Sequence, residues 1–134
     1  MLTIAYIAGL FDGEGCVYVQ KANTSSLITV SIAGSYEPVL RKVQELFSGV
    51  VRGTSKKIGN RHKKPWRWEA HGRDTLYFLE SVSPYLQEKK AQADIAIALP
   101  MPGRRRTKQE RDKWEWAHGE LKRLKREGPG YTLY

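Results

Sequence analysis

The chain has 134 residues, of which 40% are hydrophobic, enough for one domain around one hydrophobic core. Its single cysteine, Cys16, excludes an internal disulfide and indicates a reducing, intracellular compartment. The net charge of +9 favours a polyanionic partner, because each Lys or Arg placed on a phosphate releases condensed counterions. A basic surface that is merely solvated is the alternative interpretation.

The chain begins with the apolar run LTIAYIAGLF, which is too short to span a bilayer, since a span takes about 20 residues. It lacks the basic region that opens a signal peptide, and the acidic DGEG follows at once. We therefore expect a buried helix, no membrane and no presequence. The expected compartment is the prokaryotic or phage cytoplasm, or an organelle that encodes the protein.

Hydrophobic periodicity and turn residues predict nine elements. These are a helix at 2–13, strands at 16–22 and 27–34, a helix at 36–48, strands at 50–58 and 65–71, and helices at 75–82, 84–99 and from 107 onward. The order α-β-β-α-β-β-α-α-α is that of a single α+β domain. We expect one domain over 1–134, with a core at about 2–99 and a C-terminal helical extension at about 104–127.

Helix starts and buried stripes are predicted from local signals. The expected capping residues are Ser35, Asp74, Ser83 and Thr107, the last with Glu110 in a capping box. The expected buried stripes are Val39, Val43, Leu46 and Phe47 in the second helix, and Trp114, Ala117, Leu121 and Leu124 in the last helix.

Small residues recur every four positions in the first helix, at Ala5, Gly9 and Gly13, and so lie near one face. Glycine inside a helix costs about 1 kcal/mol relative to alanine. Small residues at this spacing let two helix backbones approach closely. Packing against an identical helix would offset the cost, so a homodimer is predicted.

Two carboxylates, Asp12 and Glu14, follow at the end of this helix, where the helix dipole disfavours them by about 0.3–1 kcal/mol. A twofold axis would bring two Glu14 side chains together, and such a pair either shares a proton or holds a metal. Oxygen ligands suit Mg²⁺, which serves phosphodiester hydrolysis. An acidic turn after an ordinary buried helix is the simpler interpretation of DGEG alone.

The segment IAGLFDGEG at 7–15 resembles the nine-residue motif of LAGLIDADG homing endonucleases at every position, and the resemblance extends over about 4–99. It implies an αββαββα core whose four-stranded antiparallel sheet forms a DNA-binding saddle in the major groove. One motif per chain implies a homodimer on a long pseudo-palindromic double-stranded DNA target. The implied activity is Mg²⁺-dependent, site-specific cleavage by an endonuclease of a mobile intron.

The resemblance also implies roles for individual residues. Glu14 and the main-chain carbonyl of Gly13 match the metal ligands, and Asp12 matches an acid that is mainly structural. Lys89, in PYLQEKKAQAD, matches a catalytic-site lysine, although it could be a surface lysine. Ser35 stands near the place of a Gln or Asn that orders the nucleophilic water. The implied dimer interface consists of Ala5, Ala8, Gly9, Asp12 and Gly13.

Strand alternation, together with the register of the family, gives the expected DNA contacts. They are Tyr18, Gln20, Thr29, Ser31, Arg52, Thr54, Lys56, Arg67 and Glu69. Trp66 and Trp68 should enter the core, although a slip by one residue would exchange the two faces. Phosphate contacts are expected from Lys57, Arg61, Lys63 and Lys64. Ordinary surface polarity and single-strand binding by stacking are the alternatives.

Two other functions fit the sequence. The first is a catalytically weak or inactive member that binds intron RNA or DNA as a maturase or regulator, which the lack of Gln or Asn near Gly34-Ser35 favours and the acid Glu14 opposes. The second is an oligomer that uses the first helix only as an interface.

Overall fold

The computed structural model describes residues 2–21, 26–53, 65–100 and 106–128. Its elements are α1 (Ile4–Glu14), β1 (Gly15–Lys21), β2 (Ser26–Gly34), α2 (Glu37–Phe47), β3 (Val50–Gly53), β4 (Trp66–His71), α3 (Arg73–Val82), the 3₁₀ turn η1 (Ser83–Tyr85), α4 (Lys90–Ile97) and α5 (Lys108–Glu127). The predicted α+β order is confirmed. Within the described ranges, no helix is both long and apolar enough to cross a membrane.

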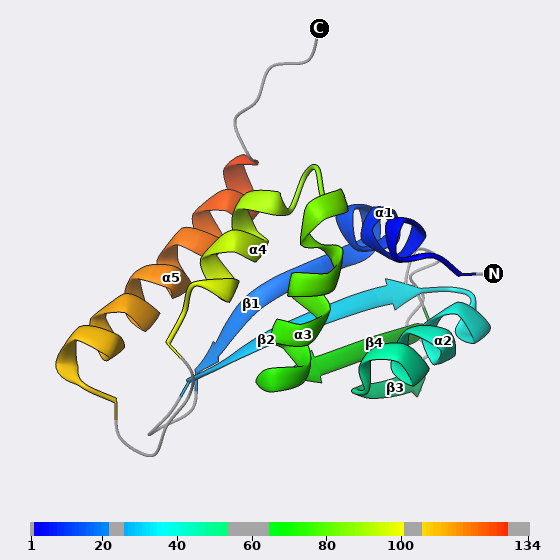
Figure 1. Cartoon of the computed structure of the whole chain (residues 1–134), viewed down its shortest axis with the longest axis horizontal. Coiled ribbons are helices and arrows are strands. Elements are labelled where there is room, and N and C mark those ends of the chain that lie inside the picture. The colour runs from blue at the N-terminus through cyan, green and yellow to red at the C-terminus, as the bar shows by residue number, and fades with distance from the viewer. Residues whose placement is uncertain (1, 22–25, 54–64, 101–105, 129–134) are drawn as a thin grey trace, which may run out of the picture.

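The four strands form one antiparallel sheet in the order β1-β2-β4-β3. Helices α1, α2 and α3 cover one face of the sheet, and α4 and α5 lie beside β1 (Figure 1). The face turned away from α1, α2 and α3 is called the open face below. The layering leaves a buried core on one side of the sheet and polar side chains on the other.

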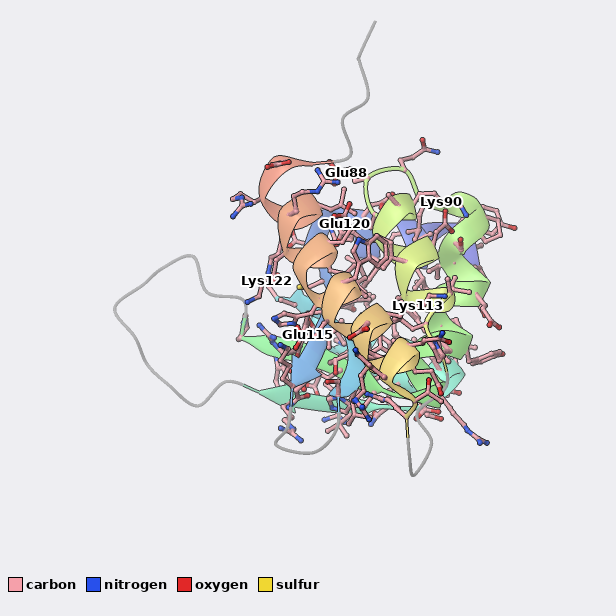
Figure 2. The ribbon with its side chains drawn as sticks, turned by 90° about the vertical axis from the view of Figure 1, so that its left-hand side faces the viewer. Glu88, Lys90, Lys113, Glu115, Glu120 and Lys122 are labelled. Carbon is pink, nitrogen blue, oxygen red and sulfur yellow. The ribbon has the colours of Figure 1, made fainter. Side chains whose placement is uncertain are left out.

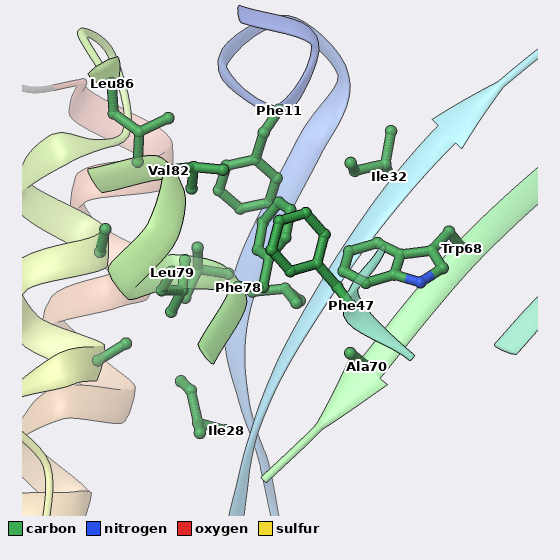
Figure 3. Close-up of a cluster of buried hydrophobic side chains, with 14 of the residues drawn as sticks. Phe11, Ile28, Ile32, Phe47, Trp68, Ala70, Phe78, Leu79, Val82 and Leu86 are labelled. Atoms are coloured by element: carbon green, nitrogen blue, oxygen red, sulfur yellow. The ribbon is translucent and has the colours of Figure 1, made fainter. Parts of the chain in front are cut away.

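Aromatic rings between the helices and the sheet form the centre of the core (Figure 3). The Phe78 ring centroid lies 4.8 Å from that of Trp68, 5.1 Å from that of Phe47 and 5.1 Å from that of Phe11. The Trp68 side chain is fully buried and donates a hydrogen bond from Nε1 to the Ser48 carbonyl oxygen at 2.8 Å. The predicted inward orientation of Trp68 is therefore confirmed, and the one-residue slip is excluded.

The last helix follows the sequence prediction closely. The Thr107 side chain accepts a hydrogen bond from the Glu110 backbone N–H, and the Glu110 side chain accepts one from the Thr107 N–H, both at 3.1 Å. The predicted buried stripe is also confirmed, because Trp114, Ala117, Leu121 and Leu124 are all buried. Three of these residues belong to the main core cluster, so α5 is part of the same domain.

Three predicted helix caps are wrong. Ser83 lies inside η1, whose N-cap is Val82, and the N-cap of α4 is Lys89. Tyr36, not Ser35, is the N-cap of α2, because β2 continues to Gly34, Ser35 lies in a bend and Tyr36 is extended. Gly72, with φ of 58°, is the N-cap of α3, because β4 ends only one residue earlier. Asp74 therefore lies inside the first turn of α3.

Two further predictions fail for reasons of packing. The buried positions of α2 are Leu40, Val43 and Phe47, whereas Leu46 lies outside this stripe and is exposed. The helix expected at 84–99 begins only at Lys90, because η1 ends in an extended residue, Leu86. The third strand ends at Gly53, and the rest of its predicted range lies outside the described residues.

Candidate active site and nucleic-acid interface

The C-terminal end of α1 is joined to the start of α4 by three hydrogen bonds between Asp12 and the loop 87–89. The Asp12 carboxylate accepts from the Gln87 backbone N–H at 2.7 Å and from the Lys89 backbone N–H at 3.0 Å. In return, Lys89 Nζ donates to the main-chain oxygen of Asp12 at 2.6 Å. An ammonium group at a helix C-terminus is favourable electrostatically, so the Lys89 side chain stabilises the same helix end that holds the loop 87–89.

Glu14 is the last residue of α1, and both it and Gly13 are exposed. The chain passes into β1 at once, and this turn requires a glycine at position 15. A Cβ atom on Gly15 would lie 2.2 Å from Phe11 Cδ1 and 2.5 Å from the Phe11 carbonyl oxygen. The turn therefore fixes Glu14 at the junction of helix and sheet, two residues from the Asp12 carbonyl that binds Lys89.

The oxygen donors at this junction fit a Mg²⁺ ion that also binds DNA. One chain contributes the Glu14 carboxylate and nearby main-chain carbonyls. Among the described residues, no three His, Cys, Asp or Glu side chains are grouped so that they could hold a metal ion. Mg²⁺ keeps several waters and needs only one or two carboxylates when phosphate oxygens complete its coordination. The donor set therefore suits a shared site rather than a closed cage within one chain.

Ser35 lies at the same end of the sheet as this junction, since Ile32 pairs with Gly15 and β2 ends at Gly34. Its side chain is exposed and makes no hydrogen bond with the described residues. Ser35 is therefore near the end of the sheet that carries Glu14 but is not joined to it by a contact.

A pocket of about 270 Å³ opens beside the junction. Its lining residues are Gly15, Cys16, Glu88, Lys89, Gln92, Leu124, Lys125 and Gly128. Lys125 reaches it from the end of α5 and donates a hydrogen bond from Nζ to Cys16 Sγ at 3.3 Å. Sequence reasoning missed Lys125, because only tertiary packing brings α5 to β1.

The outward face of α1 carries small residues, as their spacing of four positions predicts. Ala5, Gly9 and Gly13 are exposed, and a Cβ atom on either glycine would meet nothing within 4 Å. Nothing in the protomer therefore requires glycine at positions 9 and 13. Ala8 is different: it is fully buried in the core of its own protomer, so we exclude it from the predicted dimer interface.

The open face carries all of the predicted DNA-contacting residues that the structure describes. Directly paired residues of antiparallel strands share a face, and the pairs are Tyr18 with Thr29, Gln20 with Leu27, Ser31 with Glu69, and Arg52 with Arg67. The predicted alternation in all four strands is thus confirmed. The predicted contacts Thr54, Lys56, Lys57, Arg61, Lys63 and Lys64 lie outside the described residues.

Thr29 and Ser31 differ from the others because both are buried on this face, at 0% and 4% exposure. Their short side chains lie between longer neighbours. Thr29 Oγ1 lies 2.9 Å from His71 Nδ1 and donates to Gln20 Oε1 at 3.5 Å. We therefore revise the expectation that these two residues contact bases, because both are buried and Thr29 is hydrogen-bonded to its neighbours Gln20 and His71.

Arg67 and His71 lie beside Glu69 on the open face. The Glu69 carboxylate lies 3.6 Å from Arg67 Nη1 and 3.9 Å from His71 Nε2. Burial raises the pKa of the Tyr18 phenol, and the Glu69 charge raises it further, while Arg67 opposes the shift. His71 was missed in the sequence, although it continues the alternation of Arg67 and Glu69 by two residues.

Three comparisons place these observations among known proteins. The family of LAGLIDADG-like domains matches residues 2–83. The comparison with curated proteins gave no match. Among solved structures, the homing endonuclease I-CvuI in complex with its target has a TM-score of 0.69 and 20% identity, covering 97% of this chain and 85% of that chain.

Two further structures show the same fold. An archaeal intron-encoded homing endonuclease, I-Vdi141I, complexed with DNA, has a TM-score of 0.69 and 19% identity over 98% of this chain and 87% of that chain. The LAGLIDADG meganuclease I-AabMI, bound to uncleaved DNA, has a TM-score of 0.68 and 16% identity over 87% of this chain but 44% of its own. The family match spans more than half of the sequence, and the fold agrees with it: the chain belongs to the LAGLIDADG family and has the fold of its homing endonucleases.

Proposed function

We propose that the protein is a site-specific, double-strand DNA endonuclease of the homing type, active as a homodimer and dependent on a divalent metal, Mg²⁺. The observation that carries the proposal is the junction of α1 and β1. There an exposed carboxylate, Glu14, lies two residues from a carbonyl bound to the Lys89 ammonium, at the edge of a polar sheet face.

The open face supports binding in the major groove. Arg52 and Arg67 are exposed and paired across neighbouring strands, and Gln20 is exposed on β1. Arginine recognises guanine through two hydrogen bonds, and glutamine recognises adenine in the same way. The solved structures of I-CvuI and I-Vdi141I contain DNA, and the net charge of +9 suits the same partner.

The outward face of α1 supports a homodimer. Gly9 and Gly13 each cost about 1 kcal/mol in a helix, and their own protomer gives no packing reason for them. A second α1 approaching this face would supply that reason and would bring the two Glu14 carboxylates near the symmetry axis. The chain matches only 44% of the length of I-AabMI, so two copies approach the length of that protein.

The residues at the junction have separable chemical roles in phosphodiester hydrolysis. Glu14, with main-chain carbonyls such as that of Gly13, would hold Mg²⁺, which when bound polarises phosphate oxygens and makes water more acidic. The Lys89 ammonium, held by the Asp12 carbonyl, would stabilise negative charge on the attacked phosphate. Ser35, which follows β2 at the same end of the sheet, is the candidate for orienting the attacking water.

The test uses a duplex containing the uninterrupted version of the locus that flanks the gene. We expect cleavage of both strands with Mg²⁺ and none after chelation. Glu14→Gln should abolish cleavage and retain binding, and Lys89→Met should slow cleavage with binding retained. Glu45→Gln, an exposed acid on α2 that pairs with Lys42, is the control. Full cleavage by Glu14→Gln would refute the proposed chemistry.

A second candidate function is a nucleic-acid-binding member with little or no cleavage activity, such as an intron maturase or regulator. The observation that favours it is Ser35, whose short, exposed side chain stands where a longer amide is expected. This function predicts tight binding of intron RNA, no Mg²⁺-dependent nicking of the duplex, and no effect of Glu14→Gln on either.

A further inference from the structure

One side of α5 runs along strand β1. Residues 111, 115, 118, 122 and 125 recur at spacings of four and three, which places them on one side of the helix. Two of them contact opposite ends of β1: Glu115 binds Lys21 Nζ at 2.6 Å, and Lys125 binds Cys16 Sγ at 3.3 Å. We call this set (Arg111, Glu115, His118, Lys122 and Lys125) the β1-side row.

The β1-side row adjoins the open face of the sheet at its Lys125 end, whereas Lys21, which Glu115 binds, alternates with the buried Val17 and Val19. Cys16 pairs with Ser31, and Ser31 pairs with Glu69, so the thiol contacted by Lys125 belongs to the open face. In Figure 2, Glu115 and Lys122 extend from one side of α5 and Lys113 from the other. The row therefore lies beyond the edge strand, and its Lys125 end is next to the surface proposed to bind DNA.

Charge is distributed unequally around α5. Away from the β1-side row, Arg123 is held by two carboxylates, Glu120 and Glu127, and the Arg123 contact lowers the pKa of Glu120. Within the row, the only acid is Glu115, which is bound to Lys21. Among the described residues, Arg111, Lys122 and Lys125 have no carboxylate partner, so three cations on this side are not neutralised.

We infer that the β1-side row contacts the phosphate backbone of the DNA beside the groove occupied by the sheet. This inference rests on the proposed function. At 1.5 Å per residue, Arg111 and Lys125 are about 21 Å apart along the helix, comparable to roughly six phosphates of one strand at 3.4 Å each. Unpaired ammonium and guanidinium groups over such a length suit phosphates, which fix position without reading sequence.

Lys122 and Lys113 provide a matched test, because both are exposed on α5, carry the same charge and have no ion-pair partner among the described residues. Each phosphate contact contributes about 0.9 to the slope of log K against log salt concentration. We expect Lys122→Ala to reduce this slope by about 1 per chain, and Lys122→Ala with Lys125→Ala by about 2. Lys113→Ala should leave it unchanged.

The reduction in slope caused by Lys122→Ala should be the same on target and non-target duplex. Lys122→Arg should keep the wild-type slope. Circular dichroism spectra and urea unfolding check that each variant is folded. Equal slopes for Lys122→Ala and Lys113→Ala, with a wild-type chain that binds and cleaves, would overturn this inference alone. A wild-type chain that binds no duplex would overturn both the inference and the proposed function.

Discussion

Lys89 and Asp12 bind each other twice: the Lys89 backbone N–H donates to the Asp12 carboxylate, and Lys89 Nζ donates to the Asp12 carbonyl oxygen. A free lysine side chain has about 2 kcal/mol of rotamer entropy to lose on being ordered. Here the hydrogen bond from Nζ to the Asp12 carbonyl oxygen restricts the side chain within the fold. The ammonium is therefore held beside the end of α1 by the fold itself.

Asp12→Ala should lower the free energy of unfolding by about 1–3 kcal/mol, because two backbone N–H groups lose a charged acceptor. Urea unfolding measures the change. Asp94→Ala is the control, since it removes an exposed acid from α4 that pairs with Lys90, at a cost of about 0.3–0.5 kcal/mol. Equal losses in the two variants would contradict a structural role for Asp12.

Replacement by alanine should have opposite effects on stability at Gly9, inside α1, and at Gly15, directly after α1. Gly9→Ala should stabilise the isolated protomer by up to about 1 kcal/mol, because its Cβ meets nothing, yet it should weaken self-association. Gly15→Ala should destabilise the protomer by at least about 1–3 kcal/mol, because its Cβ overlaps Phe11. Thermal unfolding and sedimentation equilibrium measure the two effects. Unchanged self-association in Gly9→Ala would argue against this face as the dimer interface.

Arg67→Ala should relax base specificity at one position of each half-site, at a cost of about 1–3 kcal/mol against the preferred base. Arg67 is exposed on the open face beside Glu69. Binding assays on a set of single-substituted duplexes measure the change. Arg41→Ala, on α2 and paired with Glu37, should leave the specificity profile intact. A uniform loss across all duplexes would instead indicate a phosphate contact.

The capping box of α5 should make stability depend on pH. Hydrogen bonds from Thr107 lower the pKa of Glu110 below its usual value of 4.5. A depressed pKa in the folded state contributes stability above pH 4.5, and that contribution is lost as the pH falls through the lower, folded value. The stability difference between the wild type and Glu110→Gln should therefore shrink on acidification, as urea unfolding at pH 7 and pH 3 would reveal. A constant difference would contradict the prediction.

Local signals explain which parts of the fold could be predicted. The capping box and buried stripe of α5 depend on residues within two or three turns of one another, so the sequence contains them in full. Strand alternation likewise placed Trp68 inside and Arg67 outside. The wrong start of α4 has a distant cause, because Asp12, far along the chain, binds the backbone at Gln87 and Lys89.

The candidate site also contains some features that the local sequence predicts and others that depend on tertiary packing. Glu14 and the small face of α1 follow from a contiguous motif, which the sequence displays directly. Lys125 could not be found, because its approach to Cys16 depends on how α5 packs beside β1. The burial of Thr29 and Ser31 was also hidden, since it depends on the length of the side chains on neighbouring strands.

The position of α5 beside β1 also has a consequence for folding in the cell. β1 is the first strand of the sheet order, and such a border strand presents unpaired backbone groups that can recruit strands of other molecules. A chain truncated before α5, or one still emerging from the ribosome, would leave this border bare. The C-terminal helix therefore shields this border strand in the folded protein as well as completing its core.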